Sequence, residues 1–220
     1  MSCFMLPVGV RSSIVQKTAS FWWGTKENGS KNIHWKAWKN LVGPKEEGGL
    51  GFHDLCSFNK ALIAKQLWRI ISQPNLLMSK LLKAKYFPKC SLFDANVCST
   101  ASWLWRSWLK VRTVLTLGMR FSIGDGKAVK IWESPWIPDS VSFKPNPSFS
   151  SQLDLKWVSD LICDDGKSWN NQLIKTNFSN EDLENILKIP LKNPGRKDFL
   201  VWHLNPKGNF TVGSSYKAIL

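Results

Sequence analysis

Apolar residues recur at helical spacing through the first half of the chain. Between residues 7 and 23, Val10, Ile14 and Phe21 fall on or near one face, and a glycine follows the segment. Spacings of three and four residues place side chains on one side of a helix, and glycine commonly ends one. The same reasoning predicts further helices over residues 54–72, 75–86 and 101–117.

The predicted helix over residues 101–117 has two different faces. One is an apolar stripe that we expect to be buried, formed by Leu104, Trp108, Val111 and Leu115. Arg106 and Lys110 lie on another face, with Trp103 one turn before Arg106. Such a face is either a solvated surface or a surface that contacts an anionic partner.

The period changes after Gly118 from about 3.6 residues to about 2, which is the period of a strand. Alternating apolar residues around Gly124-Asp125-Gly126 predict a β-hairpin, and alternation around residues 205–208 predicts a second. Short helices are predicted at residues 168–176 and 181–188, and the last residues, SSYKAIL, look like the start of another helix. The predicted fold class is therefore mainly α with a smaller α+β region: a basic helical bundle followed by two β-hairpins and short helices.

Charge divides the chain into two parts. Residues 1–120 contain 18 Lys and Arg against 5 Asp and Glu, whereas residues 121–220 contain 12 against 11. We therefore expect a basic helical region over residues 1–120 and a smaller α+β region over residues 121–220. An excess of positive charge on one part of a protein attracts polyanions such as nucleic acid, acidic protein or anionic lipid.

The chain has thirteen tryptophans, and most of them are expected in the core. Trp22, Trp38, Trp68 and Trp108 fall where helical periodicity predicts burial. A ring on which a base stacks must instead be exposed beside positive charge, and Trp103 meets that condition best.

Catalytic and metal-binding patterns are not evident. The five cysteines include no C-x-x-C pair, and the three histidines add no zinc-binding spacing, so we expect reduced intracellular thiols. The GDGK segment is too short for a phosphate-binding loop. Asp164 and Asp165 are expected in a solvated turn rather than in a metal site.

Basic residues in three consecutive predicted helices form the candidate binding site. A solvated face is the alternative, but few acidic residues compensate these charges. The candidate residues are Lys65, Arg69, Lys80, Lys83, Trp103, Arg106 and Lys110.

Several segments, in this order and spacing, resemble one family. They read FWWG, HWKAWKNLVGPKEEGGLGFHDLCSFNKALIAKQLWRI, LLKAKYFP, SWLWRSWLKVR, FSIGDGKAVKIWESPWIP and GNFTVGSSYKAI. Together they resemble the reverse transcriptases of plant non-LTR (LINE-type) retrotransposons, nearly end to end.

The resemblance implies a position within the longer enzyme. It corresponds to the thumb and connection region, between the polymerase palm and a zinc-binding segment that ribonuclease H often follows. The aromatic-x-Asp-Asp polymerase motif and the carboxylates of ribonuclease H are missing from this chain, so we expect a fragment that ends within its C-terminal region and is inactive alone. By resemblance, Mg²⁺ is needed only by the missing polymerase domain, and no cofactor by this chain.

Two functions remain open at this stage. The first is auxiliary binding of nucleic acid, an RNA/DNA hybrid or duplex, without sequence specificity. The second is a structural or protein-interaction remnant of a decayed retroelement. No membrane partner and no small-molecule substrate are expected, and the expected location is nuclear or cytoplasmic, without secretion.

Overall fold

The computed structural model describes residues 3–24, 33–43, 45–146, 155–191 and 195–220. Within them the chain is mainly α-helical with a small two-stranded antiparallel sheet, which confirms the predicted mainly α class with a smaller β-containing part. The helices and strands are α1 (Val8–Trp23), α2 (Trp38–Leu41), α3 (Leu55–Ser72), α4 (Leu77–Tyr86), α5 (Trp103–Val111), β1 (Met119–Ser122), α6 (Asn171–Asn177), α7 (Asn180–Leu187), β2 (Phe199–Trp202) and α8 (Val212–Ile219). Short 3₁₀ helices cover Lys45–Glu47, Arg112–Leu117 and Val158–Leu161. No described helix is both long and apolar enough to cross a membrane.

The chain forms two compact units. The first contains residues 1–114 together with residues 211–220, and the second contains residues 115–210. The last helix therefore belongs to the same unit as the first 114 residues. Whether residues 1–120 and 121–220 fold separately stays a prediction.

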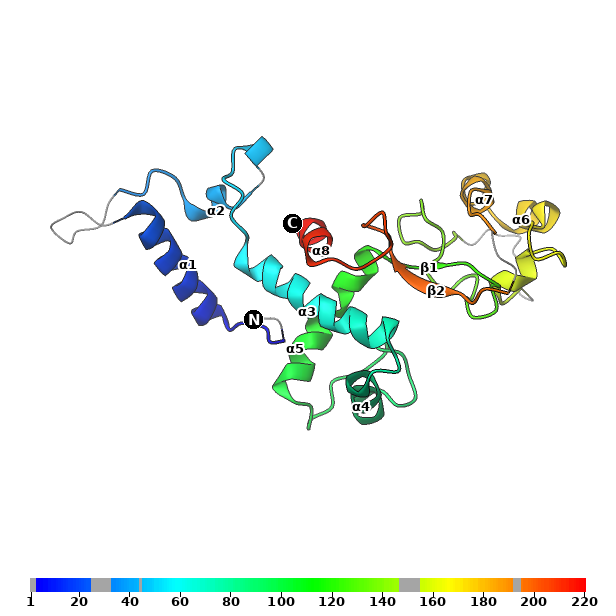
Figure 1. Ribbon diagram of the computed structural model, residues 1–220, viewed down its shortest axis with the longest axis horizontal. Helices are drawn as coiled ribbons and strands as arrows, with labels where there is room; N and C mark the ends of the chain where they lie inside the picture. The colour runs from blue at the N-terminus through cyan, green and yellow to red at the C-terminus, as the bar shows by residue number, and fades with distance from the viewer. Residues whose placement is uncertain (1–2, 25–32, 44, 147–154, 192–194) are drawn as a thin grey trace. The chain divides into compact units, whose positions relative to one another are not determined.

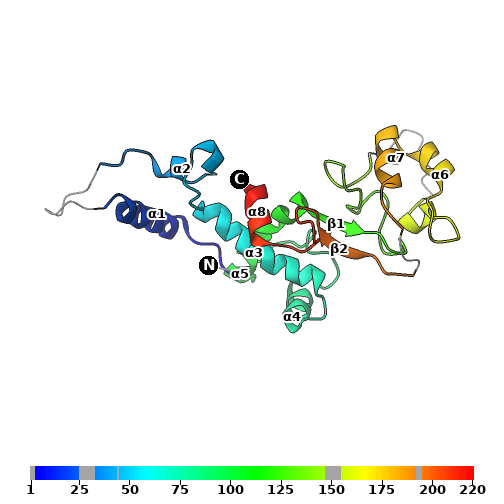
Figure 2. The same ribbon diagram turned by 45° about the horizontal axis from the view of Figure 1, so that its top comes forward.

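Helix α3 is the centre of the first unit (Figure 1). It begins where predicted, because the Asp54 carboxylate accepts a hydrogen bond from the backbone N–H of Ser57 at 2.7 Å. Ala61, Ile63 and Leu67 on this helix are fully buried. Helices α4, α5 and α8 pack against it, and α8 lies beside it in both ribbon views (Figure 2).

Helix α5 is shorter than predicted but buries the predicted stripe. It ends at Val111 and continues as a 3₁₀ helix to Leu117. Trp108, Val111 and Leu115 are buried, and Leu104 is half-buried. Trp105, outside that stripe, is also fully buried.

The tryptophans predicted to be buried divide into two groups. Trp68 and Trp108 are in the core, as predicted. Trp22 is 48% exposed although its ring makes an edge contact with Phe52 at 4.9 Å, and the prediction was wrong there. Trp38 is half-buried and stacks on the same Phe52 ring at 5.0 Å.

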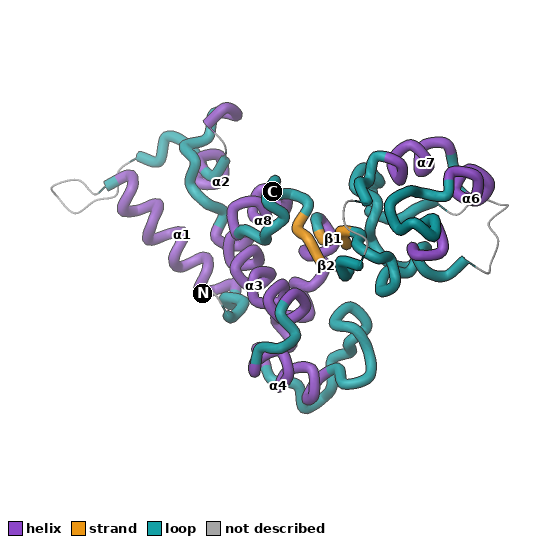
Figure 3. The backbone as a smooth tube through the Cα atoms, turned by 45° about the vertical axis from the view of Figure 1, so that its right-hand side comes forward, coloured by secondary structure: helices purple, strands orange, loops and turns teal. Residues whose placement is uncertain are grey.

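The second unit consists largely of loops folded around a core (Figure 3). Its fully buried side chains include Ile131, Trp136, Leu161, Ile174 and Ile186. The two predicted short helices form as α6 and α7, and the Ser179 hydroxyl caps α7 by accepting from the backbone N–H of Asp182 at 3.1 Å.

The first predicted hairpin does not form. Strand β1 pairs with β2 instead, with Met119 opposite Trp202 and Ser122 opposite Phe199. The turn after β1 is folded around the side chain of Asp198, which is distant in sequence. Lys130, farther along, forms an isolated bridge with Trp157. The alternating pattern identified strand β1 but not its partner.

Asp198, which lies just before β2, organises the turn after β1. Its carboxylate accepts hydrogen bonds from the backbone N–H groups of Gly124 at 2.7 Å, Gly126 at 3.0 Å and Ala128 at 3.0 Å. A Cβ atom at Gly124 would lie 2.1 Å from the backbone oxygen of Arg196, so only glycine fits there. The GDGK segment is therefore a structural turn in which the N–H groups of Gly124 and Gly126 already donate to Asp198.

The second predicted hairpin forms only its first strand and its turn. The N–H of Trp202 donates to the carbonyl of Gly208 at 2.7 Å, which closes the turn over residues 205–208. No second strand follows in the described residues 209–220, because the Thr211 hydroxyl caps α8 by accepting from Ser214 N–H at 3.1 Å. Helix α8 then buries Tyr216 in the first unit, which confirms the C-terminal helix.

We predict that Asp198→Ala lowers the free energy of unfolding by about 2–3 kcal/mol, because three backbone N–H groups lose a charged acceptor. Urea denaturation measures the change. Asp164→Ala in an exposed turn is the control, expected within about 0.5 kcal/mol of the parent. Equal stability of the two variants would show that the turn does not depend on Asp198.

Candidate functional site

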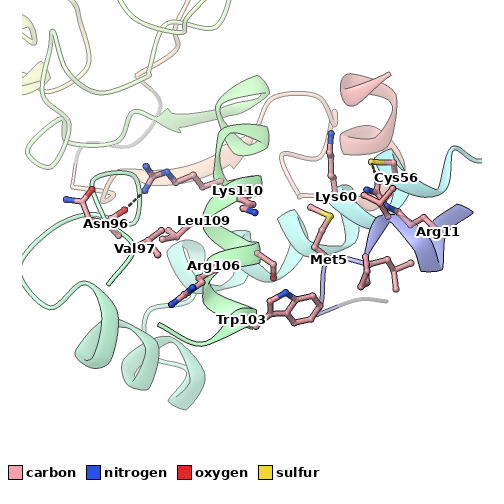
Figure 4. A pocket seen from close by; sticks show the side chains of 16 residues that line it. Met5, Arg11, Cys56, Lys60, Asn96, Val97, Trp103, Arg106, Leu109 and Lys110 are labelled. Atoms are coloured by element: carbon pink, nitrogen blue, oxygen red, sulfur yellow. Dashed lines mark hydrogen bonds between the residues drawn. The ribbon is translucent and has the colours of Figure 1, made fainter. Parts of the chain in front are cut away.

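An open groove in the first unit brings together residues from five parts of the chain, including α5. Its volume is about 1000 Å³. Figure 4 shows Met5 from the N-terminal segment, Arg11 from α1, Lys60 from α3, and Asn96 from the loop before α5. The face of α5 completes the groove.

The groove is lined by basic side chains without acidic ones. No Asp or Glu among the described residues lines it. The one described ion pair, Lys130 with Glu133, lies in the second unit. The basic residues that line the groove are Arg11, Lys60, Arg106, Lys110 and Arg112.

Helix α5 contributes the predicted basic and aromatic face. The hydroxyl of Ser102 caps the helix by accepting from the N–H of Trp105 at 3.3 Å. Burial of the apolar stripe then turns Trp103, Arg106 and Lys110 into the groove (Figure 4). The sequence identified these three neighbours correctly, and their role in binding stays a prediction.

The two α5-side arginines also hold the preceding loop in place. Arg106 donates to the carbonyl oxygens of Ala101 at 3.0 Å and Ser99 at 2.6 Å. Arg112 donates to the carbonyl of Ala95 at 2.5 Å. A guanidinium has five N–H donors, so each arginine can hold the loop and still present charge to the groove.

The two lysines of the groove have no such structural role. Neither the Lys60 nor the Lys110 ammonium group has a hydrogen-bond or ion-pair partner among the described residues. Lys60 is half-buried and Lys110 is exposed. Their ammonium groups are therefore available to an anionic ligand.

A buried asparagine fixes the N-terminal wall of the groove. Asn59 on α3 is fully buried; its side-chain oxygen accepts from the N–H of Leu6 at 2.8 Å, and its amide donates to the carbonyl of Phe4 at 2.9 Å. The indole N–H of Trp108 donates to the carbonyl of Cys3 at 2.6 Å. Residues 3–6 are thus attached to α3 and α5.

This attachment also places an aromatic pair at the groove. The rings of Phe4 and Trp103 stack with centroids 5.4 Å apart and planes at 19°. Trp103 remains 54% exposed and Phe4 46% exposed. The pair combines apolar surface with neighbouring positive charge, which is the arrangement expected of a stacking platform.

The other predicted binding residues lie outside this groove. Lys65 and Arg69 are exposed on α3, and Lys80 and Lys83 are exposed on α4. Sequence reasoning missed Arg11, Lys60 and Asn59 because helical spacing relates residues within one element only. It missed Arg112 because a residue two positions after Lys110 does not share its helix face. The FNK segment at residues 58–60, within the longest stretch of the family resemblance, could have drawn attention to Asn59 and Lys60.

No group of three or more metal-binding side chains occurs among the described residues. Asp165 lies in an exposed turn, as predicted. Hydrogen bonds from the backbone N–H of Lys167 and from Ser168 lower its pKa. The described part of the chain therefore offers cations for binding but no cluster for metal-assisted chemistry.

Comparison with known proteins finds two plant relatives, both from Arabidopsis thaliana. The chain is 43% identical over 146 residues to "Uncharacterized mitochondrial protein AtMg00310", an alignment that covers 66% of this chain and 94% of the relative. It is 29% identical over its whole length to "Putative ribonuclease H protein At1g65750", of which it spans 36%. These relatives agree with a plant protein derived from a transposable element. No protein-family model and no solved structure matches the chain.

We predict that Asn59→Leu lowers the free energy of unfolding by about 2–3 kcal/mol, because the backbone N–H of Leu6 and the carbonyl of Phe4 lose their partner in the core. Hydrogen exchange should show faster exchange of the Leu6 amide. Gln66→Leu, on the same helix and half-buried, is the control, expected within about 0.5 kcal/mol of the parent. Unchanged protection of Leu6 in Asn59→Leu would contradict the attachment.

Proposed function

The chain belongs to the same family as the Arabidopsis thaliana mitochondrial protein AtMg00310, and we propose that it is a nucleic-acid-binding segment derived from a reverse transcriptase. It would correspond to the thumb and connection region of the retrotransposon enzyme. In that role it holds nucleic acid for chemistry carried out by other domains. The proposed segment needs no cofactor, and Mg²⁺ would serve the polymerase domain.

One observation carries this proposal: five basic side chains line one groove, and no described carboxylate neutralises them there. Like charges in one groove repel each other, and their combined field favours an anionic ligand. Contacts from Lys and Arg to phosphates supply affinity without reading sequence. The function proposed is therefore binding that does not depend on base order.

The name of one relative supports a general link to nucleic acid rather than a specific binding role. The name of At1g65750 refers to ribonuclease H, an activity on nucleic acid, and the present chain spans 36% of that protein. The family resemblance implies a segment beside catalytic domains. Both observations favour a role in holding nucleic acid.

An apolar surface supports the second candidate function, a protein-interaction remnant. Leu77 is 73% exposed and Leu81 is 60% exposed on α4. They border a second groove of about 440 Å³ that also includes Met78, Leu82 and Leu104. Exposed apolar surface of this kind is typical of protein interfaces.

Salt dependence separates the two functions. Binding to phosphates releases counterions, so the logarithm of the affinity should fall linearly with the logarithm of salt concentration. An apolar interface should respond far less. Fluorescence anisotropy of labelled oligonucleotides, titrated at several salt concentrations, measures the slope.

We predict that Lys60→Gln and Lys110→Gln each weaken binding of all sequences alike and lower the salt slope by about one unit. These lysines are the sharpest test, because Arg106 and Arg112 also hold the loop. Lys207→Gln, exposed in the second unit, is the charge-matched control. If both variants bind like the parent at every salt concentration, the groove is a solvated surface and the interaction remnant is favoured.

A further inference from the structure

We propose that the groove binds a single-stranded segment of nucleic acid rather than a duplex, with one base stacked on Trp103. This inference rests on the proposed function and specifies its ligand. Lys60 and Lys110 would contact backbone phosphates of the same strand.

The mixed lining of the groove is the first reason. Besides its cations it contains the apolar side chains of Met5, Val97 and Leu109 (Figure 4). Val97 is 56% exposed, so its part of the apolar lining is accessible. A duplex shows phosphates on its outside and keeps its base faces stacked inside, whereas a single strand can present both phosphates and base faces.

The aromatic pair is the second reason. More than half of the Trp103 surface is accessible although Phe4 stacks on it. A base added to the Phe4–Trp103 pair would replace exposed apolar surface by a stacking contact. Every base has such a face, so this contact is compatible with binding that ignores sequence.

The rigidity of the walls is the third reason. Asn59 holds the N-terminal wall, and Arg106 and Arg112 hold the loop that carries Val97. The groove is therefore formed before the ligand arrives, which lowers the entropy cost of binding. The flexible lysines can then adjust to phosphates.

An acidic peptide with apolar side chains would also match charge and apolar surface. The aromatic pair favours nucleic acid, because a flat base covers an indole more completely than a flexible aliphatic chain does. A peptide is therefore an outcome of the test rather than a second proposal.

The experiment compares one labelled strand of about 16 nucleotides, free, as a DNA duplex and as an RNA/DNA hybrid. Fluorescence anisotropy on the full chain gives each affinity across a salt series. We expect the free strand to bind about tenfold more tightly than either double-stranded form, and Trp103→Leu to weaken it about tenfold. Trp35→Leu, where the parent ring is 81% exposed, should bind like the parent. Each lysine variant should lower the salt slope for the single strand by about 0.7 rather than the 0.9 expected for a duplex.

Each contrary result has a distinct meaning. Equal or tighter duplex binding that still weakens in Lys60→Gln and Lys110→Gln would overturn the single-strand inference and leave the proposed function intact. If Trp103→Leu bound like the parent, or if Trp35→Leu weakened binding equally, the single-strand inference would also be overturned.

Displacement of the strand by an acidic amphipathic peptide of equal length and charge at equal concentration would identify a peptide site instead. Absence of binding to all three nucleic acids at low salt would overturn the proposed function itself. Denaturant unfolding of Trp103→Leu ensures that lost binding is not lost folding.

Discussion

Burial of α3 among the other helices of its unit is the constraint on which the basic groove depends. Ala61, Ile63 and Leu67 leave no exposed surface, so the orientation of α3 is fixed by packing. Lys60 then lies at the groove, and the adjacent Asn59 points inward to hold residues 4–6. Helix α5 packs against α3 and buries Trp108 and Val111, so its basic face turns outward.

The groove uses its charged residues in two different ways. Arg106 and Arg112 donate some of their N–H groups to backbone carbonyl oxygens, and these hydrogen bonds maintain the shape of the site. Lys60 and Lys110 have no partner among the described residues and supply adjustable charge. The distinction follows from chemistry, because a planar guanidinium suits fixed multiple hydrogen bonds and a flexible ammonium suits mobile point contacts. Substituting the arginines would therefore alter stability and binding together.

The second unit depends on contacts between residues far apart in sequence. Asp198 organises the turn at residues 124–128, and β1 finds its partner in β2 rather than across that turn. Long-range pairing of this kind carries a larger loop-closure entropy than a local hairpin. The charged hydrogen bonds of Asp198 and the buried core of this unit offset that cost.

The sequence by itself determined the elements that rest on local physics. Helical periodicity and the caps at Asp54 and Ser179 placed α3 and α7, and the spacing of Trp103, Arg106 and Lys110 put one wall of the groove on one face. Only the tertiary structure decided which strands pair, and which residues from other segments complete the groove. Lys60 and Arg11 reach it, and Asn59 supports its N-terminal wall, because separate segments pack there. The periodicity of the sequence contains no information about that packing. Periodicity indicates which face of an element is buried, whereas the partner that buries it depends on all elements competing for the same apolar surface.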